Sequence, residues 1–188
     1  MKQIILLATA CITACVSVRA QHVGIGTTTP AFRLDVAGSI NTDSVYRIGG
    51  NTVLTVKGTA NTFTGVQSGI ANSTGTENSA VGYRSLFSNA TGSYNTATGM
   101  EALFANTTGT FNTGIGWHAL RANTTGTANA AMGEALEFNS SGSFNTAIGH
   151  GALYLNTTAD ANTAVGSFAL LSNSTGYSNS AFGADAMR

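Results

Sequence analysis

Few residues of this chain have the chemistry that catalysis or metal binding requires. The histidines are His22, His118 and His150. Acidic residues are scattered, and they include Glu77, Glu101, Glu134, Glu137, Asp160 and Asp185. Paired carboxylates need a fixed separation across a cleft for acid–base work, and the pattern indicates no cleft. We find no nucleophile elbow, phosphate loop or metal motif. The sequence therefore predicts no catalytic residue, no cofactor, no bound metal, calcium included, and no enzyme.

The N-terminus has the pattern of an export signal. Lys2 is followed by an apolar run, Ile4 to Val18, which is short for a membrane span. We predict a signal peptide over 1–20 with cleavage after Ala20. The alternative is a lipoprotein site at Cys15. Both interpretations predict an exported protein, secreted or held at the cell surface, with no transmembrane segment in the mature chain.

Composition excludes other classes. Only 9% of the residues are charged, against about a quarter in typical domains. Loss of Lys2 and Arg19 with the signal leaves six basic residues against eight acidic ones. Nucleic-acid binding needs clustered Lys or Arg, so we exclude it. The two cysteines, Cys11 and Cys15, lie in the predicted signal, so cleavage after Ala20 leaves no disulfide.

A repeated block dominates the rest of the chain. Successive blocks are 17 residues apart, apart from one interval of 16. Each begins with an asparagine, and these are Asn61, Asn78, Asn95, Asn112, Asn129, Asn145, Asn162 and, in a partial block, Asn179. We number positions from this residue. Such periodicity is typical of solenoids.

Several other positions of the block are nearly constant. Glycine occupies position 5 at Gly65, Gly82, Gly99, Gly116, Gly133, Gly149, Gly166 and Gly183. Such constancy indicates a backbone angle or close approach that excludes a side chain. Position 4 is mostly apolar, as in Ile115 and Ile148, and position 9 is mostly leucine. A second asparagine follows, as in Asn106. It begins Asn-x-Ser/Thr at seven places, which we interpret as turn chemistry rather than as glycosylation sites.

These positions predict a β-solenoid, a parallel β-roll of 17-residue coils over 61–188. The run from position 1 to the glycine predicts a short strand. The alanine–leucine piece that follows predicts a single helical turn, with a second strand as the alternative. Ordering 17 residues costs on the order of 25 kcal/mol, and burying the apolar residues of positions 4 and 9 returns only about 2–3 kcal/mol each. One coil therefore cannot fold without its neighbours.

Residues 21–60 do not follow the repeat well. Val23–Gly26 and Arg33–Gly38 predict two short strands around a turn at Pro30. Val45–Ile48 and Asn51–Val56 predict a hairpin across Gly49-Gly50. We expect this region to be a small β cap on the first coil.

The Asn-Thr-Ala-Val/Ile-Gly blocks resemble the head repeats of trimeric autotransporter adhesins. With Val23–Pro30 and Leu34–Gly38, they are more similar to exported tail-fibre-like proteins of Bacteroidetes-type bacteria. The resemblance covers 21–188 and implies a non-catalytic structural or adhesion protein of the cell surface or a fibre. It also implies a homotrimer, with a host-surface or glycan ligand. The patterns of a coiled-coil stalk, an anchor or a chaperone domain are not found among these residues.

Two further patterns concern the surface. Aromatic residues too many for one narrow coil indicate an interface, and they are Tyr94, Phe111, Phe144 and Tyr177, with Phe87, Phe104, Trp117, Tyr154 and Phe168. Threonine recurs at position 2, which predicts as an alternative function an ice- or polysaccharide-binding face. That column is Thr62, Thr96, Thr113, Thr146 and Thr163, interrupted by Ser79, Ala130 and Ser180.

Overall fold

The computed structural model describes residues 23–25, 34–36, 45–48, 51–55 and 57–188. The predicted signal peptide and Pro30 lie outside these residues. The chain divides into two units, Met1–Thr42 and Asp43–Arg188. In the first unit β1 (Val23–Ile25) and β2 (Leu34–Val36) pair in parallel, with Val23 opposite Leu34.

The second unit begins with a hairpin that is part of the solenoid's sheet. Strands β3 (Val45–Ile48) and β4 (Asn51–Thr55) are antiparallel, and β4 pairs with β5, also antiparallel. The amide of Gly65 donates to the carbonyl of Val53 at 2.8 Å. Residues 43–60, which we grouped with the preceding segment in the sequence, thus belong to the same unit as the repeats.

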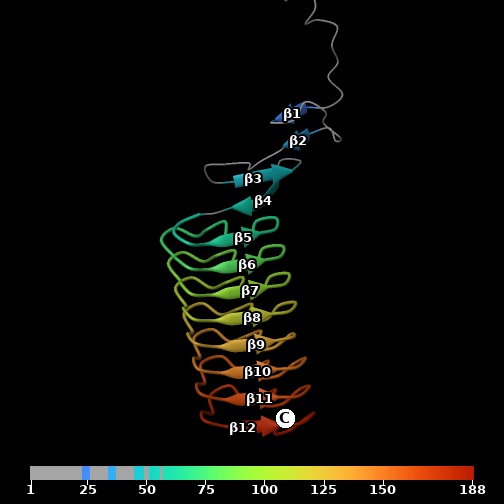
Figure 1. The fold of residues 1–188 in the computed structure, drawn as a ribbon. Coiled ribbons are helices and arrows are strands. Elements are labelled where there is room, and N and C mark those ends of the chain that lie inside the picture. The colour runs from blue at the N-terminus through green and yellow to red at the C-terminus, as the bar shows by residue number, and fades with distance from the viewer. Residues whose placement is uncertain (1–22, 26–33, 37–44, 49–50, 56) are drawn as a thin grey trace, which may run out of the picture. The chain divides into compact units, whose positions relative to one another are not determined.

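Each repeat contributes one three-residue strand, and the strands stack in chain order (Figure 1). Every neighbouring pair is parallel, with equal positions facing each other, as Thr96 faces Thr113. The strands are β5 (Thr62–Thr64), β6 (Ser79–Val81), β7 (Thr96–Thr98), β8 (Thr113–Ile115), β9 (Ala130–Met132), β10 (Thr146–Ile148), β11 (Thr163–Val165) and β12 (Ser180–Phe182). The predicted β-solenoid is confirmed.

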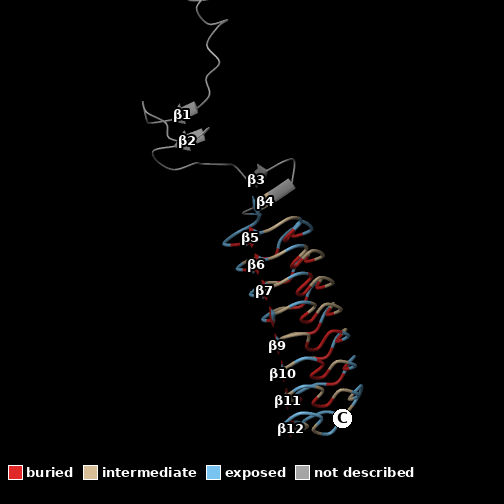
Figure 2. Cartoon of the chain, turned by 90° about the vertical axis from the view of Figure 1, so that its right-hand side faces the viewer, coloured by how far each residue is buried: buried red, intermediate tan, exposed pale blue. Residues whose placement is uncertain are grey.

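The core lies between the strand and the turn that follows it (Figure 2). In each block the residue at position 3, the middle of the strand, is buried, and the residues at positions 2 and 4 face outward. The fully buried side chains include Ala97 and Ala147 of position 3 and Leu103 and Leu153 of position 9. Our expectation that position 4 supplies core was wrong, since Ile148 is 40% exposed. Side chains alternate along a strand, and burial of the position 1 asparagine also turns position 3 inward.

The alanine–leucine piece is not the helical turn that we favoured. No helix occurs in the described ranges, so none long and apolar enough to cross a membrane is found there. The position 9 leucines have φ between 47° and 54°, which interrupts a right-handed helix. The amide of Leu103 donates to the carbonyl of Ala119 in the next coil at 2.9 Å. The turn therefore stacks on its neighbours through backbone hydrogen bonds, as the strands do.

The first coil departs from the pattern without leaving a void. It has Gly69 in place of the leucine and Phe63 in place of the alanine. Phe63 is fully buried, and a Cβ added to Gly69 would lie 2.4 Å from its ring. The phenyl ring therefore fills the space that the leucine occupies in later coils.

Two of the position 5 glycines allow the effect of backbone strain to be tested separately from the effect of steric crowding. Gly99 (φ 131°) and Gly133 (φ 92°) both lie in the region unfavourable to side chains. A Cβ on Gly99 would meet the carbonyl oxygen of Gly116 at 2.3 Å, whereas on Gly133 its nearest neighbour is 3.4 Å away. We expect Gly99→Ala to lower the free energy of unfolding by about 1–3 kcal/mol more than Gly133→Ala, because overpacking adds to the backbone strain.

Urea denaturation of both variants measures this difference. Equal losses would show that φ alone requires glycine at this position.

Candidate functional site

Two asparagine ladders run through the interior of the solenoid. In the first ladder, the side-chain oxygen at position 1 accepts a hydrogen bond from the backbone amide of the next block-starting asparagine. Asn112 Oδ1, for example, accepts from the backbone amide of Asn129 at 3.0 Å. The Nδ2 of Asn112 donates to the carbonyl of Gly126 at 2.8 Å. The block-starting asparagines from Asn61 to Asn162 are at most 1% exposed. Their amides are thus satisfied inside the protein, as burial requires.

The second ladder joins the other asparagines of successive blocks from Asn72 to Asn156. Asn123 Nδ2 donates to Asn106 Oδ1 at 2.8 Å and to the carbonyl of Gly126 at 3.1 Å. Gly126 therefore accepts from both ladders at once. A Cβ there would lie 2.4 Å from Asn123 Oδ1, which explains the turn glycine. The side chains of these asparagines make hydrogen bonds in the interior, in agreement with a turn role.

The position 5 glycines form a third column beside the strands. Gly116 has a φ of 131°, and a Cβ on it would lie 2.8 Å from the carbonyl oxygen of Gly133. Both the backbone angle and the close approach therefore exclude a side chain. Gly183 in the last coil has positive φ, but nothing lies within 4 Å of its Cβ position.

Loss of one ladder rung is expected to be costly. Asn112→Leu removes the acceptor for the Asn129 amides and the donor to Gly126. We expect a loss of about 1–3 kcal/mol in the free energy of unfolding for each buried group left unpaired. Thr113→Val, on the outward side of the same coil, is the matched control and should change it by less than about 0.5 kcal/mol. Thermal and urea melts check this. Equal stability of the two variants contradicts an inward ladder.

Charged side chains gather where positions 6 to 10 of successive coils stack, a surface that we call the turn face. Glu101 is 8% exposed and accepts from Arg84 Nη1 at 3.0 Å and from Arg121 Nε at 2.8 Å. The hydrogen bond from Arg121 holds the pKa of Glu101 below its usual value, against the opposing effect of burial. Arg84 also lies over the rings of Phe87 and Phe104, at 4.6 and 4.5 Å, so both arginines hold fixed positions.

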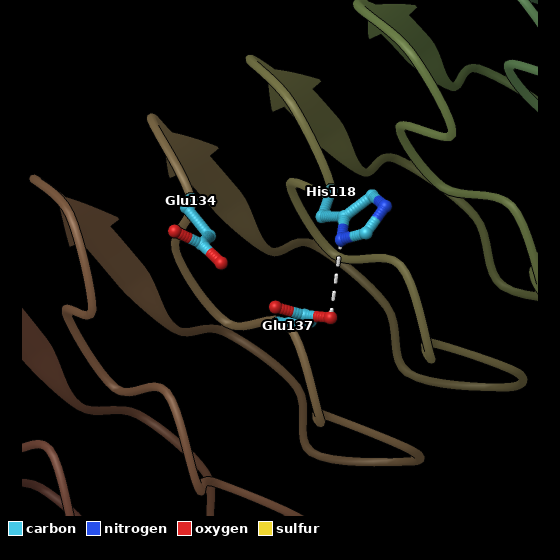
Figure 3. Close-up of side chains that lie close together, drawn as sticks. All are labelled: His118, Glu134 and Glu137. Carbon is cyan, nitrogen blue, oxygen red and sulfur yellow. Dashed lines mark ion pairs between the residues drawn. The ribbon is translucent and has the colours of Figure 1, made fainter.

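Figure 3 shows His118, Glu134 and Glu137 together on this face. The Nδ1 of His118 lies 3.2 Å from Glu137 Oε1, and its Nε2 lies 3.5 Å from Glu101 Oε2. Trp117 stacks on the imidazole with ring centroids 3.7 Å apart. The ligand atoms of His118, Glu134 and Glu137 all lie within 4.8 Å of one another, so these residues could hold a metal ion.

The shortened block shapes this cluster. The amide of Gly151, at position 7, donates to the carbonyl of Glu134, as position 7 amides do to position 6 carbonyls in other coils. Glu134 therefore occupies position 6, and its coil has no residue at position 7.

His150 Nε2 lies 2.8 Å from Glu134 Oε2. A surface hollow of about 210 Å³ lies beside them, lined by Glu134, His150, Gly151, Tyr154, Phe168 and Leu171. Burial raises the pKa of Tyr154, and Glu137 raises it further.

Sequence reasoning treated these residues as unrelated. The structure brings together Glu101, Glu134, Glu137, His118 and His150, and among the described residues it leaves Glu77 and Asp160 outside the cluster. Alignment of the blocks by position could have predicted this cluster from the sequence. Glu101 and His118 both occupy position 7 of adjacent blocks, and Arg121 and Glu137 both occupy position 10. His22 lies outside the described residues.

The outward side of β5–β12 is a second surface, which we call the strand face. Threonines of position 2 and apolar residues of position 4 form two parallel columns on it. The exposed apolar side chains of position 4 are Val81 (45% exposed), Ile115 (37%), Met132 (50%), Ile148 (40%) and Phe182 (70%). Val165 is partly buried, and Thr64 and Thr98 interrupt the column. Where Ala130 interrupts the threonine column, a hollow of about 80 Å³ lies between Ile115, Met132 and Ile148.

No protein-family model, curated protein or solved structure matches this chain. The turn face and the strand face are therefore the features of this chain that indicate its function.

The buried carboxylate of the turn face gives a third prediction. Glu101→Gln leaves Arg84 and Arg121 without their anion, and both arginines can still reach solvent. We expect a loss of about 1–3 kcal/mol in the free energy of unfolding, because charged hydrogen bonds contribute about that much. Glu77→Gln removes an exposed carboxylate and should cost less than about 0.5 kcal/mol. Urea denaturation at neutral pH measures both, and equal effects would contradict a structural role for the Glu101 ion pairs.

Proposed function

We propose that this chain is a non-catalytic structural or adhesion protein, exported to the cell surface or built into a fibre, whose copies associate through the strand face. The observation that carries the proposal is the exposed apolar column of position 4. Its side chains follow one another without interruption from Ile115 to Phe182, whereas Thr64 and Thr98 lie on either side of Val81 in the first coils. Contiguous exposed apolar surface of this kind marks an interface.

The interior supports a structural role. Each coil is joined to the next by strand pairing, turn hydrogen bonds and two asparagine ladders. Such a stack is held at every level along its length, which suits a rigid rod that presents the same surface repeatedly. The described residues offer shallow hollows rather than a cleft lined by paired carboxylates.

The partner that fits the strand face best is a second and third copy of this chain. The face is apolar and almost uncharged, so another uncharged, regularly spaced surface complements it. Aromatic residues just before the strands add apolar area, and they are Tyr94 (46% exposed), Phe111 (60%), Phe144 (65%) and Tyr177 (77%). Three columns around an axis would bury these residues and close the assembly. The resemblance to trimeric adhesin heads supports the same arrangement.

A second candidate is binding of ice or a crystalline polysaccharide through the threonines. It is favoured by the outward direction and common register of Thr96 with Thr113 and of Thr146 with Thr163. Ser79, Ala130 and Ser180 interrupt the column, and the hollow at Ala130 breaks its flatness. We therefore place it second.

Light scattering of the purified full chain tests the assembly. We expect a mass three times that of the chain measured under denaturing conditions. The double variant Ile115→Lys with Ile148→Lys should be monomeric, because it places like charges in the apolar interface. Thr125→Lys, an exposed turn residue away from the strand face, is the control and should stay trimeric.

A monomeric wild-type chain would contradict the trimer. An ice-recrystallisation assay and a pull-down on insoluble polysaccharide, each with Thr113→Lys as the face variant, would then test the second candidate.

A further inference from the structure

We propose that His118, Glu134 and Glu137 form a binding site for one divalent transition-metal ion, with Zn²⁺ as the best fit. The three residues come from two successive coils, so the ion would join these coils on the turn face. Each offers one ligand atom, and all of these atoms lie within 4.8 Å of one another. The site is separate from the strand face and does not depend on the proposed assembly.

Unpartnered buried atoms point to a cation between these side chains. Glu137 is 6% exposed, and its Oε2 has no hydrogen-bond partner. The Nδ1 of His118 is also buried and makes no hydrogen bond. Buried polar groups without a partner are destabilising, so native structures contain few of them. A metal ion would accept electron pairs from His118 Nδ1 and from the Glu137 carboxylate, whose other oxygen, Oε1, is the one that lies nearest to that nitrogen.

The spacing fits one tetrahedral ion. Ligand atoms about 2.0–2.1 Å from zinc, at the tetrahedral angle, lie about 3.3 Å apart. The distance from His118 Nδ1 to Glu137 Oε1 is 3.2 Å. The side chain of Glu134 is 17% exposed, and its ligand atom lies within 4.8 Å of the other two. A hollow of about 210 Å³ lies beside Glu134 on the side of His150.

The surroundings orient the ligands as they do at known metal centres. Imidazoles that bind a metal with one nitrogen usually direct the other at a carboxylate. The Nε2 of His118 faces Glu101, which Arg84 and Arg121 hold in place. Glu134 is contacted from outside by His150 Nε2 at 2.8 Å. These outer contacts position the inner groups and touch no ion themselves.

The donor set selects the class of ion. Ca²⁺ and Mg²⁺ prefer sites made only of oxygen. One imidazole nitrogen with two carboxylates suits zinc and its transition-metal neighbours instead. Two carboxylates also balance the charge of a divalent ion. The alternative occupant of the gap is a second proton on His118, which would make the cluster an ordinary ion pair.

Isothermal titration of the metal-free, untagged full chain with Zn²⁺ separates these cases. We expect one ion per chain, with no saturation by Ca²⁺ or Mg²⁺ at the same concentrations. Glu137→Gln and His118→Asn should each weaken binding at least about 100-fold, since even loss of an outer contact costs about 10- to 100-fold. Glu77→Gln, which changes an exposed carboxylate outside the cluster, is the control and should bind as the wild type does.

Circular dichroism checks that each variant folds. If an inner variant does not fold, His150→Asn replaces it, with an expected weakening of about 10-fold. Absence of saturable Zn²⁺ binding overturns the proposal, and so does binding that Glu137→Gln and His118→Asn leave unchanged. Light scattering of the same samples keeps this result distinct from the trimer test.

Discussion

The buried asparagine amides are the constraint on which the rest of this structure depends. A narrow coil has little apolar volume, so polar side chains occupy much of its interior. Each amide must then find partners at a fixed height, in its own turn and in the next coil. Asn112 and Asn123 meet this requirement by sharing the carbonyl of Gly126. The shared carbonyl ties both asparagines of a coil to one point and requires a small residue at the turn.

Close stacking has a conformational cost that the repeat offsets locally. The position 9 leucines adopt left-handed backbone angles, which cost about 1–3 kcal/mol each. In return each leucine is buried, which contributes about 1.5–3 kcal/mol, and its amide bonds to the next coil, as Leu103 does to Ala119. The strain and its compensation thus lie in the same residue, so the arrangement can recur in every coil that stacks on a neighbour.

Because the coils stack in constant register, the period of the sequence determines which side chains lie together on the surface. Residues 17 apart in the sequence become neighbours one strand spacing apart, about 4.8 Å. This places Arg84, Glu101 and His118 in one column. The missing residue after Gly133 leaves a gap in that column, and Glu134 lies beside it. The same register aligns the apolar side chains of the strand face. The constant stacking register therefore produces both the turn face and the strand face.

The sequence alone determined the repeat, the solenoid and the positions of glycine and asparagine, because these follow from backbone requirements that recur at every block. It also indicated strands at Val45–Ile48 and Asn51–Val56, where the structure has β3 and β4 (Asn51–Thr55). It did not reveal which strand position is buried, since Ala147 and Ile148 are both apolar and only the inward asparagine decides between them. It suggested a helical turn where left-handed leucines stack instead, since spacing alone does not report the hand of the backbone. The cluster of His118, Glu134 and Glu137 arose only in the tertiary structure, because contact across coils depends on the exact register that hydrogen bonding between neighbouring coils imposes.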